Sequence, residues 1–279
     1  MTEQDKFDGD KRDPQSFIRA LARGLSVIEG LSGKVDGCSL SEVANECDLD
    51  RATARRILMT LTELRYVRAT GSRYFLAPRA LSLGYAYLSS IPYWEVAAPI
   101  MEQLVQQINE SCSAATLDGA HVVYVARVRS NKRFVDVSRT VGSRIPAYCT
   151  SLGRILLSAL PSAELKKVFA MTKFVEHTRF TVTDIPTLTR ILSEVKQQGW
   201  AVVDQEMEIG LRSLAVPLHD QHGAVVAALN VSVQADRISV EDMIQNYLEP
   251  LKTTAQHLDE ASRTRQTAVF PLKLSNISV

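Results

Sequence analysis

Apolar residues recur at the helical period in successive segments near the start of the chain. Residues 16–31 carry the first of these patterns, and the turn-prone residues 32–37 end it. Ser39 and Glu42 then show the spacing of a capping box, in which each side chain bonds the backbone N–H of the other residue. This spacing predicts a second, shorter helix over residues 40–47.

A third helix is predicted over residues 51–64, and Asp50 can cap its first turn. Its apolar residues form one stripe, which we expect to be buried, namely Ala54, Ile57, Leu58, Leu61 and Leu64. The arginines of this segment fall mostly on the other side of the helix. Two helices joined by a tight turn, the second with an arginine-bearing face, are typical of a helix-turn-helix.

Two β-prone runs, residues 66–68 and 74–76, follow this pair of helices. The turn between them contains Gly71, so we expect a β-hairpin of the kind that forms the wing of a winged helix. Pro78 ends the hairpin, and residues 79–90 return to a helical pattern that would connect two domains.

Beyond residue 92 the pattern changes to short β-prone runs among helical segments. Helices are predicted over residues 95–109, 151–160, 162–170, 185–198 and 240–264, and strands over 112–117, 121–128, 134–138, 200–204, 214–218 and 225–233. Asp118 and Gly119 form a strong hairpin signal between two of these strands. These features predict an α+β domain with a mainly antiparallel sheet flanked by helices.

These patterns divide the chain into five parts. They are a flexible polar tail over residues 1–15, a winged helix-turn-helix domain over 16–77, a linker helix over 78–92, a second domain over 93–265 and a C-terminal tail over 266–279. A length of 279 residues suits two domains, each with a core of its own.

Charged residues are unevenly distributed, although the formal net charge is only +1. Between residues 51 and 79 there are seven arginines and one acidic residue, Glu63. Such a basic stretch within a nearly neutral chain indicates a face that meets phosphate groups. The chain opens with a polar segment and has no apolar run near the ~20 residues that a membrane helix needs, so we expect a cytoplasmic protein with no membrane partner.

Double-stranded DNA is therefore the predicted partner of the first domain. Arg51 and Arg55 lie one turn apart near the start of the third helix, where recognition helices touch bases, and arginine can bond guanine through two hydrogen bonds. The candidate DNA-binding residues are Ser39, Arg51, Ala52, Thr53, Arg55, Arg56, Arg68 and Arg73. The alternative is a solvated arginine face on an ordinary helix of a bundle.

Catalytic and metal-binding patterns are weak. The four cysteines, Cys38, Cys47, Cys112 and Cys149, are widely spaced, and no histidine has metal-ligand spacing to them, so we expect no metal, no cofactor and no disulfide framework. Cys149 could serve as the nucleophile of an enzyme, although a packed free cysteine is the simpler interpretation. We therefore predict that the protein is not an enzyme, with a cysteine-dependent enzyme as the alternative.

Two polar regions of the second domain could hold a ligand. Thr150 or Ser151 can cap the helix that follows residues 142–149, and the free N–H groups of that helix would favour an anion. A plain capped loop is the alternative interpretation. Asn230 and Ser232 share one face of a predicted strand, which makes that face either a solvent face or the wall of a pocket.

Several of these motifs, in this order, resemble the IclR family of transcriptional regulators. The resemblance rests on the winged helix over residues 17–76, the loop over 142–154 and the run over 199–217, and it extends over about residues 16–265. Residues 16–25, 83–90 and 204–206 are most similar to the branch of that family that controls aromatic catabolism through the β-ketoadipate pathway. Members of this branch respond to protocatechuate, p-hydroxybenzoate, β-ketoadipate or muconate-like acids, and many are activators.

The resemblance implies an effector-binding, GAF-like domain over residues 93–265 and a nucleoid-associated protein that binds operator DNA. It also implies a homodimer formed through the DNA-binding half, with tetramers common, and contact with RNA polymerase in an activator. A repressor with a different effector is the alternative. Carried over by position, the effector site would include Ala147, Tyr148, Thr150, Glu206, Leu211, Arg212, Ser213, Asn230 and Ser232.

This sequence departs from the family pattern at four of these or adjoining positions. Tyr148 stands where many members have histidine, Val203 where many have an acid, Ser213 where cysteine is frequent and Asn230 where serine is frequent.

An acidic effector is favoured by the arginines near the proposed site. Arg144, Arg154 and Arg212 lie in or beside the expected lining, and the arginine fork binds carboxylates through two hydrogen bonds. An aromatic acid could also stack near Tyr148. The predicted effector is therefore an aromatic or dicarboxylic acid, such as protocatechuate, p-hydroxybenzoate or β-ketoadipate.

Overall fold

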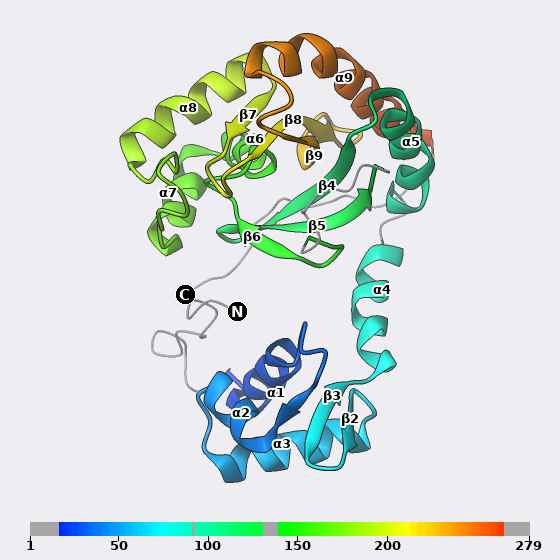
Figure 1. Ribbon diagram of the computed structural model, residues 1–279, viewed down its shortest axis with the longest axis vertical. Coiled ribbons are helices and arrows are strands. Elements are labelled where there is room, and N and C mark those ends of the chain that lie inside the picture. The colour runs from blue at the N-terminus through cyan, green and yellow to red at the C-terminus, as the bar shows by residue number, and fades with distance from the viewer. Residues whose placement is uncertain (1–16, 91–92, 131–138, 265–279) are drawn as a thin grey trace. The chain divides into compact units, whose positions relative to one another are not determined.

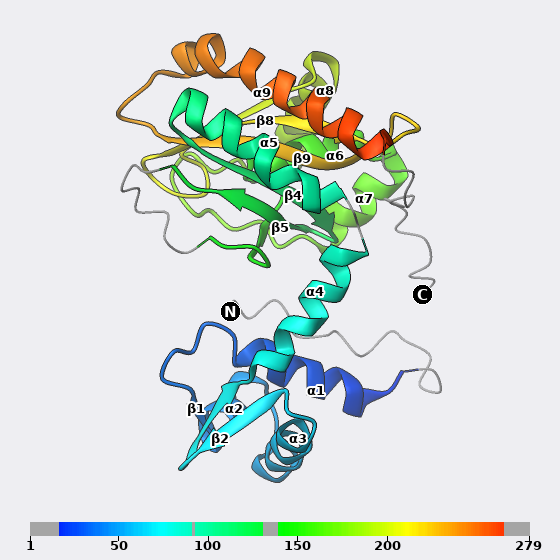
Figure 2. The same ribbon diagram turned by 90° about the vertical axis from the view of Figure 1, so that its right-hand side faces the viewer.

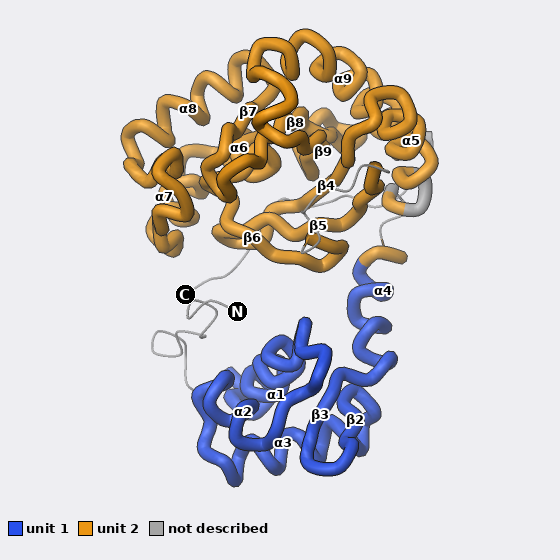
Figure 3. The backbone as a smooth tube through the Cα atoms, in the orientation of Figure 1, with its two compact units in different colours: residues 1–87, 277–279 blue, residues 88–276 orange. Residues whose placement is uncertain are grey.

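The computed structural model describes residues 17–90, 93–130 and 139–264 (Figure 1). The predicted tails at 1–15 and 266–279 and the predicted strand at 134–138 lie outside these residues. The chain divides into two compact units, of which the first ends at Tyr87 and the second begins at Leu88 (Figure 3). Across the described ranges no helix combines the length and apolar character that a membrane crossing requires.

The N-terminal unit packs three helices against a small antiparallel sheet. Its elements are α1 (Arg19–Gly30), α2 (Leu40–Glu46), α3 (Arg51–Glu63), β1 (Cys38–Ser39), β2 (Val67–Thr70) and β3 (Arg73–Leu76), with strand order β1-β3-β2. Its core contains Val27, Leu31, Cys38, Val43, Leu58, Leu61 and Val67. The three predicted helices and the hairpin are present, whereas the two-residue strand β1 was not predicted because it is too short to show an alternating pattern.

Both predicted helix caps are formed. The Ser39 N–H donates to Glu42 Oε2 over 2.6 Å and the Glu42 N–H donates to Ser39 Oγ over 3.3 Å, which completes the capping box of α2. Asp50 Oδ1 accepts from the Thr53 N–H over 2.9 Å at the start of α3. These bonds satisfy N–H groups that have no acceptor inside the helix, so they define where each helix begins.

The buried stripe of α3 is shorter than predicted. Ala54, Leu58 and Leu61 are buried, but Leu64 is 48% exposed. The prediction for Leu64 was wrong because α3 ends at Glu63, and Arg65 has a left-handed φ of 63° that turns the chain away from the helical row.

A linking segment follows the hairpin. It consists of a 3-10 turn (Pro78–Ala80) and helix α4 (Leu81–Ser89), in which no side chain is buried.

The C-terminal unit is built on a six-stranded sheet in which all neighbouring strands are antiparallel (Figure 1). The strands are β4 (Ser111–Asp118), β5 (His121–Val128), β6 (Arg144–Pro146), β7 (Ala201–Asp204), β8 (Leu211–His219) and β9 (Val225–Gln234), in the order β6-β5-β4-β9-β8-β7. This confirms the α+β class and the mainly antiparallel sheet. The short edge strand β6 lies inside what was predicted to be a loop.

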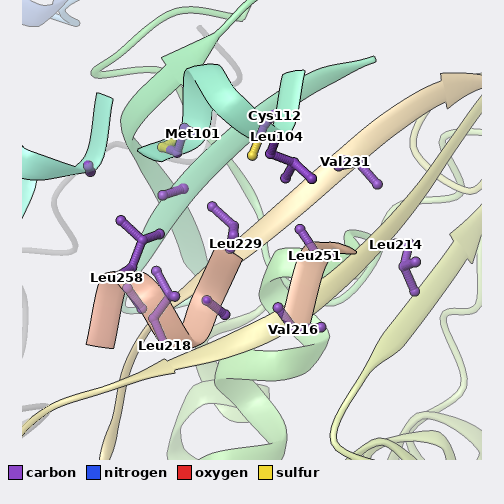
Figure 4. Close-up of a cluster of buried hydrophobic side chains, with 14 of the residues drawn as sticks. Met101, Leu104, Cys112, Leu214, Val216, Leu218, Leu229, Val231, Leu251 and Leu258 are labelled. Atoms are coloured by element: carbon purple, nitrogen blue, oxygen red, sulfur yellow. The ribbon is translucent and has the colours of Figure 1, made fainter. Parts of the chain in front are cut away.

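Helices cover both faces of this sheet (Figure 2). The helices α5 (Tyr93–Ile108) and α9 (Val240–Thr264) lie on one face, and α6 (Ser151–Ala159), α7 (Ser162–Met171) and α8 (Ile185–Gln198) lie on the other. Figure 4 shows side chains of α5 and α9, such as Met101 and Leu258, around Leu229 on the first face. Because strand residues alternate between faces, each face has a core of its own.

The face that receives α6 carries small side chains. Ala115, Ala201, Ala215 and Ala228 are buried there. Their size lets α6 approach the sheet closely, and its first seven residues are all buried. The polar residues at the start of α6 are thereby brought against the strands.

Candidate functional site

A pocket lies where the start of α6 meets the sheet. It encloses about 330 Å³ of space, part of which is open to solvent. It is lined by Tyr124, Arg139, Ile145, Cys149, Thr150, Ser151, Leu152, Val203, Met207, Leu211, Ser213, Asn230 and Ser232. Five predicted effector-binding residues are among them, namely Thr150, Leu211, Ser213, Asn230 and Ser232.

The first turn of α6 supplies the polar end of this pocket. Thr150 Oγ1 accepts from the Gly153 N–H over 3.1 Å and so caps the helix. Ser151 and Leu152 follow at the first two helical positions, where backbone N–H groups have no acceptor within the helix. The partial positive charge at a helix start favours an anion there.

Two buried polar atoms of the pocket have no hydrogen-bond partner among the described residues. They are Ser151 Oγ and Asn230 Oδ1. Asn230 Nδ2 donates to Ser232 Oγ over 3.3 Å, which confirms that these two residues share a face of β9. An unpaired buried polar atom costs about 1–3 kcal/mol, so a polar molecule in the pocket would offset that cost.

Apolar and sulfur-containing side chains form the rest of the wall. Cys149 Sγ lies 3.5 Å from Met207 Sδ, and Tyr124, Ile145 and Leu152 complete this side. Sulfur makes favourable contacts with the edges of aromatic rings, so the wall suits a flat ring.

Cys149 is a packed thiol. It is fully buried, and burial raises its pKa to about 12. The thiolate is the reactive form of cysteine, and at neutral pH this thiol is protonated. Cys149 is therefore not the reactive thiolate that a cysteine-dependent enzyme would need. No group of three or more potential metal ligands comes together in the described part of the chain.

Arg154 is engaged by a carboxylate of the chain itself. Its guanidinium lies 2.7 Å from Glu206, and both side chains are buried. Glu206 also accepts from the Val182 N–H over 3.1 Å, and Arg154 Nε donates to the Tyr148 carbonyl over 3.3 Å. Neither Arg154 nor Glu206 lines the pocket, so the pair holds the loops around it.

Arg212 and Arg144 are paired in the same way. Arg212 bonds both carboxylate oxygens of Asp204, over 2.8 and 2.9 Å, and Arg144 Nε donates to Asp118 over 3.0 Å. Neither lines the pocket. For Arg212 the reason is strand alternation, because its neighbours Leu211 and Ser213 face the pocket and its own side chain lies on the other side of β8.

A different arginine, Arg139, lines the pocket. It is buried and lies 3.3 Å from Glu208. Sequence reasoning missed Arg139 because it directly follows the predicted strand over residues 134–138, and no local signal directs its side chain to the start of α6.

Tyr148 and Ala147 lie behind the pocket in the core. The Tyr148 hydroxyl donates to the Val175 carbonyl over 2.5 Å and accepts from its N–H over 2.9 Å. Its ring packs edge-on against Phe174, and burial raises its pKa to about 12. Tyr148 therefore anchors the segment between α7 and α8, and the pocket lining does not include it or Ala147.

The N-terminal unit presents a second candidate site on α3. Arg51, Ala52, Arg55 and Arg56 are exposed. Within the described residues, the guanidinium groups of Arg51, Arg55 and Arg56 make no ion pair or hydrogen bond. They are therefore available to phosphate groups or base edges.

The other predicted DNA-binding residues have partners inside the unit. Arg68 stacks over Phe75 at 4.2 Å, and Arg73 donates to the Gly37 carbonyl over 3.0 Å, so both support the hairpin. Ser39 and Thr53 take part in the helix caps.

Both units match domains of one protein family. The IclR helix-turn-helix domain matches residues 20–71, and the C-terminal domain of bacterial IclR transcriptional regulators matches residues 85–260.

The chain is also similar to characterised proteins. The Pca regulon regulatory protein of Pseudomonas putida is 39% identical over 246 residues, which is 88% of this chain and 84% of that protein. The p-hydroxybenzoate hydroxylase transcriptional activator of Acinetobacter baylyi is 31% identical over 248 residues, which is 88% of this chain and 92% of that protein. The inducer-binding domain of a PobR double mutant from Acinetobacter, solved with 3-hydroxybenzoic acid, is 30% identical with a TM-score of 0.56, covering 61% of this chain and 98% of that one.

Proposed function

The chain belongs to the IclR family of bacterial transcriptional regulators, and we propose that its C-terminal unit senses a hydroxylated aromatic acid in the pocket at the start of α6. One observation carries this proposal. Two buried polar atoms of the pocket, Ser151 Oγ and Asn230 Oδ1, have no partner among the described residues. A ligand with two polar groups on a flat apolar body would satisfy both.

The carboxylate of the effector would lie against the start of α6. The first N–H groups of that helix and the Ser151 hydroxyl can donate to it, and Arg139 adds positive charge at the wall. The three arginines that favoured an acid on sequence grounds, Arg144, Arg154 and Arg212, do not contribute, because none of them lines the pocket.

The hydroxyl of the effector would lie near Asn230. Asn230 donates through Nδ2 to Ser232, which leaves Oδ1 as an acceptor in need of a donor. A phenolic hydroxyl supplies that donor and a second carboxylate does not. The relatives agree with this chemistry, since one activates a p-hydroxybenzoate hydroxylase gene and another was solved with 3-hydroxybenzoic acid.

Calorimetric titration tests the proposal. We expect 3-hydroxybenzoate, 4-hydroxybenzoate or protocatechuate to bind at micromolar concentrations, and benzoate to bind roughly tenfold or more weakly because Asn230 Oδ1 stays unpaired. Ser151→Ala should weaken binding by roughly tenfold on the same grounds. Ser158→Ala is the matched control, because Ser158 lies on α6 outside the pocket.

Preference for β-ketoadipate or cis,cis-muconate over every hydroxybenzoate would reject an aromatic effector. Binding of benzoate as tightly as 4-hydroxybenzoate would reject the role of Asn230.

We further propose that the protein activates transcription of genes for aromatic acid catabolism, through contact with RNA polymerase. The Acinetobacter baylyi relative, which is named as an activator, supports this sign of regulation. Because the operator DNA lies in the bacterial cytoplasm, the protein would act there. Expression of a reporter gene under the operator should rise when the effector is added. Deletion of the gene for this protein should then lower that expression, whereas deletion of the gene for a repressor would raise it.

A homodimer is proposed from the exposed apolar side chains of the N-terminal half. Ile18, Leu21 and Leu25 are exposed on or beside α1, and Leu81, Leu83, Tyr85 and Tyr87 are exposed on α4. Burial of these side chains against a second copy would remove apolar surface from water. A dimer would also require two operator half-sites.

A further inference from the structure

We infer that the exposed face of α3 reads guanine and thymine, with Arg55 and Arg56 bonding guanines and with Ala52 and Met59 contacting thymine methyl groups. This inference rests on the prediction that α3 is the second helix of a helix-turn-helix and touches the bases of operator DNA. It goes further by assigning base preferences to individual side chains, including Met59, which is not among the predicted DNA-binding residues.

Helix geometry places the four side chains together. Ala52 and Met59 are seven residues apart, which is almost two turns, so they stand on one line along α3. This line lies opposite the buried row of Ala54, Leu58 and Leu61. Arg55 and Arg56 lie on either side of the line. The outward face of α3 is therefore an apolar strip between two arginines.

Met59 is 58% exposed on this strip. A single exposed apolar residue is common on protein surfaces. This one, however, lies at the centre of the face that carries Arg55 and Arg56, whose guanidinium groups have no partner within the described ranges. Because those charges would draw α3 to DNA, Met59 would be carried into the groove with them.

Arg51 adds a third exposed guanidinium at the start of α3, Thr53 lies in its capped first turn, and two later threonine hydroxyls already donate within the helix. Thr60 Oγ1 donates to the Arg56 carbonyl over 3.0 Å, and Thr62 Oγ1 donates to the Leu58 carbonyl over 2.7 Å. The helix contains no asparagine, glutamine or aspartate, and its carboxylate, Glu63, is the last residue.

This inventory restricts which bases α3 can recognise. Guanine presents two acceptors in the major groove, which suit arginine, and thymine presents a methyl group, which suits an apolar contact. Recognition of adenine by a paired donor and acceptor needs an amide side chain, and recognition of cytosine needs an acceptor. The chemistry on the outward face thus selects half-sites in which guanine and thymine are adjacent.

Selection from a random-sequence duplex library with the full-length protein is the first step of the test. We expect enriched half-sites to contain guanines beside thymines. In the selected duplex each thymine is then replaced in turn by deoxyuridine, which removes the methyl group and keeps every hydrogen-bonding atom. Loss of one buried methyl should weaken binding roughly three- to fivefold at one or two thymines per half-site.

Variants assign the effect to side chains. In Met59→Ala the deoxyuridine effect should disappear at one thymine, while Arg55→Ala should lose preference at one guanine. The matched control is Met171→Ala, which alters a methionine of the C-terminal unit that is 55% exposed and should keep the full effect. Both methionines are exposed, so thermal unfolding should remain unchanged.

Two results would overturn the inference while leaving DNA binding intact. They are an enriched site without thymine, and binding that is indifferent to every deoxyuridine substitution. Failure to enrich any sequence would overturn this inference together with the proposed DNA-binding function.

Discussion

Arg154 and Glu206 lie buried side by side where α6 meets the turn after β7, with their closest polar atoms 2.7 Å apart. Removal of one partner of such a pair leaves an uncompensated charge in the protein interior. Burial already raises the pKa of the Glu206 carboxyl above its ordinary value, and the Arg154 guanidinium opposes that shift. The charge of Glu206 at neutral pH therefore depends on Arg154.

Arg154→Met should destabilise the C-terminal unit by about 3–5 kcal/mol at pH 7.5. Without Arg154 the folded-state pKa of Glu206 rises further above its unfolded value, so the folded state holds the proton more tightly. Stability of the variant should therefore increase as the pH falls from 7.5 towards 5.5. Urea unfolding followed by circular dichroism at both pH values measures this.

The double variant Arg154→Met with Glu206→Leu serves as the control, since it removes both charges. It should recover most of the lost stability and lose the pH dependence. Equal stability of Arg154→Met at both pH values would show that Glu206 is not the buried charge at issue.

Helix α6 is the element that forms the pocket, and its position depends on a close approach to the preceding loop. Gly153 lies so near the Ala147 carbonyl that a Cβ atom there would come within 2.0 Å of its oxygen. The absence of a side chain at this position therefore lets the polar start of α6 face the sheet.

Gly153→Ala should displace the first turn of α6. We expect a loss of about 1–3 kcal/mol in the free energy of unfolding, which is typical of overpacking. Effector binding should fall more than stability does, because Ser151 moves with the helix. Denaturant unfolding and calorimetric titration give the two quantities.

Gly84→Ala is the matched control, because nothing lies within 4 Å of a Cβ atom at that position of α4. Alanine favours a helix over glycine by about 1 kcal/mol, so this variant should be at least as stable as the original protein. Normal effector binding by Gly153→Ala would mean that the start of α6 does not hold the ligand.

At the scale of the whole molecule, the two units differ in how much apolar surface they leave exposed on their helices. The C-terminal unit covers both faces of its sheet, whereas α4 buries none of its side chains. Large exposed apolar patches on a protein mark surfaces that meet a partner.

In the proposed homodimer, Leu81→Glu combined with Tyr85→Glu would bury new charges against the second copy, so this double variant should be a monomer. Sedimentation velocity should report a mass that is half that of the unaltered dimer, and binding to a two-half-site operator should weaken. Ile209→Glu, at an exposed apolar residue of the C-terminal unit, is the control and should leave the mass unchanged. A dimer that persists in the α4 variant would place the interface elsewhere.

Local interactions account for what could be predicted from the sequence. The capping box of Ser39 and Glu42 and the shared face of Asn230 and Ser232 involve residues two or three positions apart, where backbone geometry decides which groups meet. Strand alternation would also have excluded Arg212 from a pocket that contains Leu211 and Ser213.

Periodicity and helix caps act over a few residues, and they were enough to predict the helices, most strands, the α+β class and the two-part organisation. Which arginines are neutralised depends instead on contacts between distant parts of the chain. Arg154 meets a carboxylate 52 positions away, and no local pattern specifies that distance. The tertiary structure likewise brought Arg139 to the pocket and, among the described residues, left the α3 arginines without a carboxylate, because partner choice among charged side chains depends on how distant segments pack.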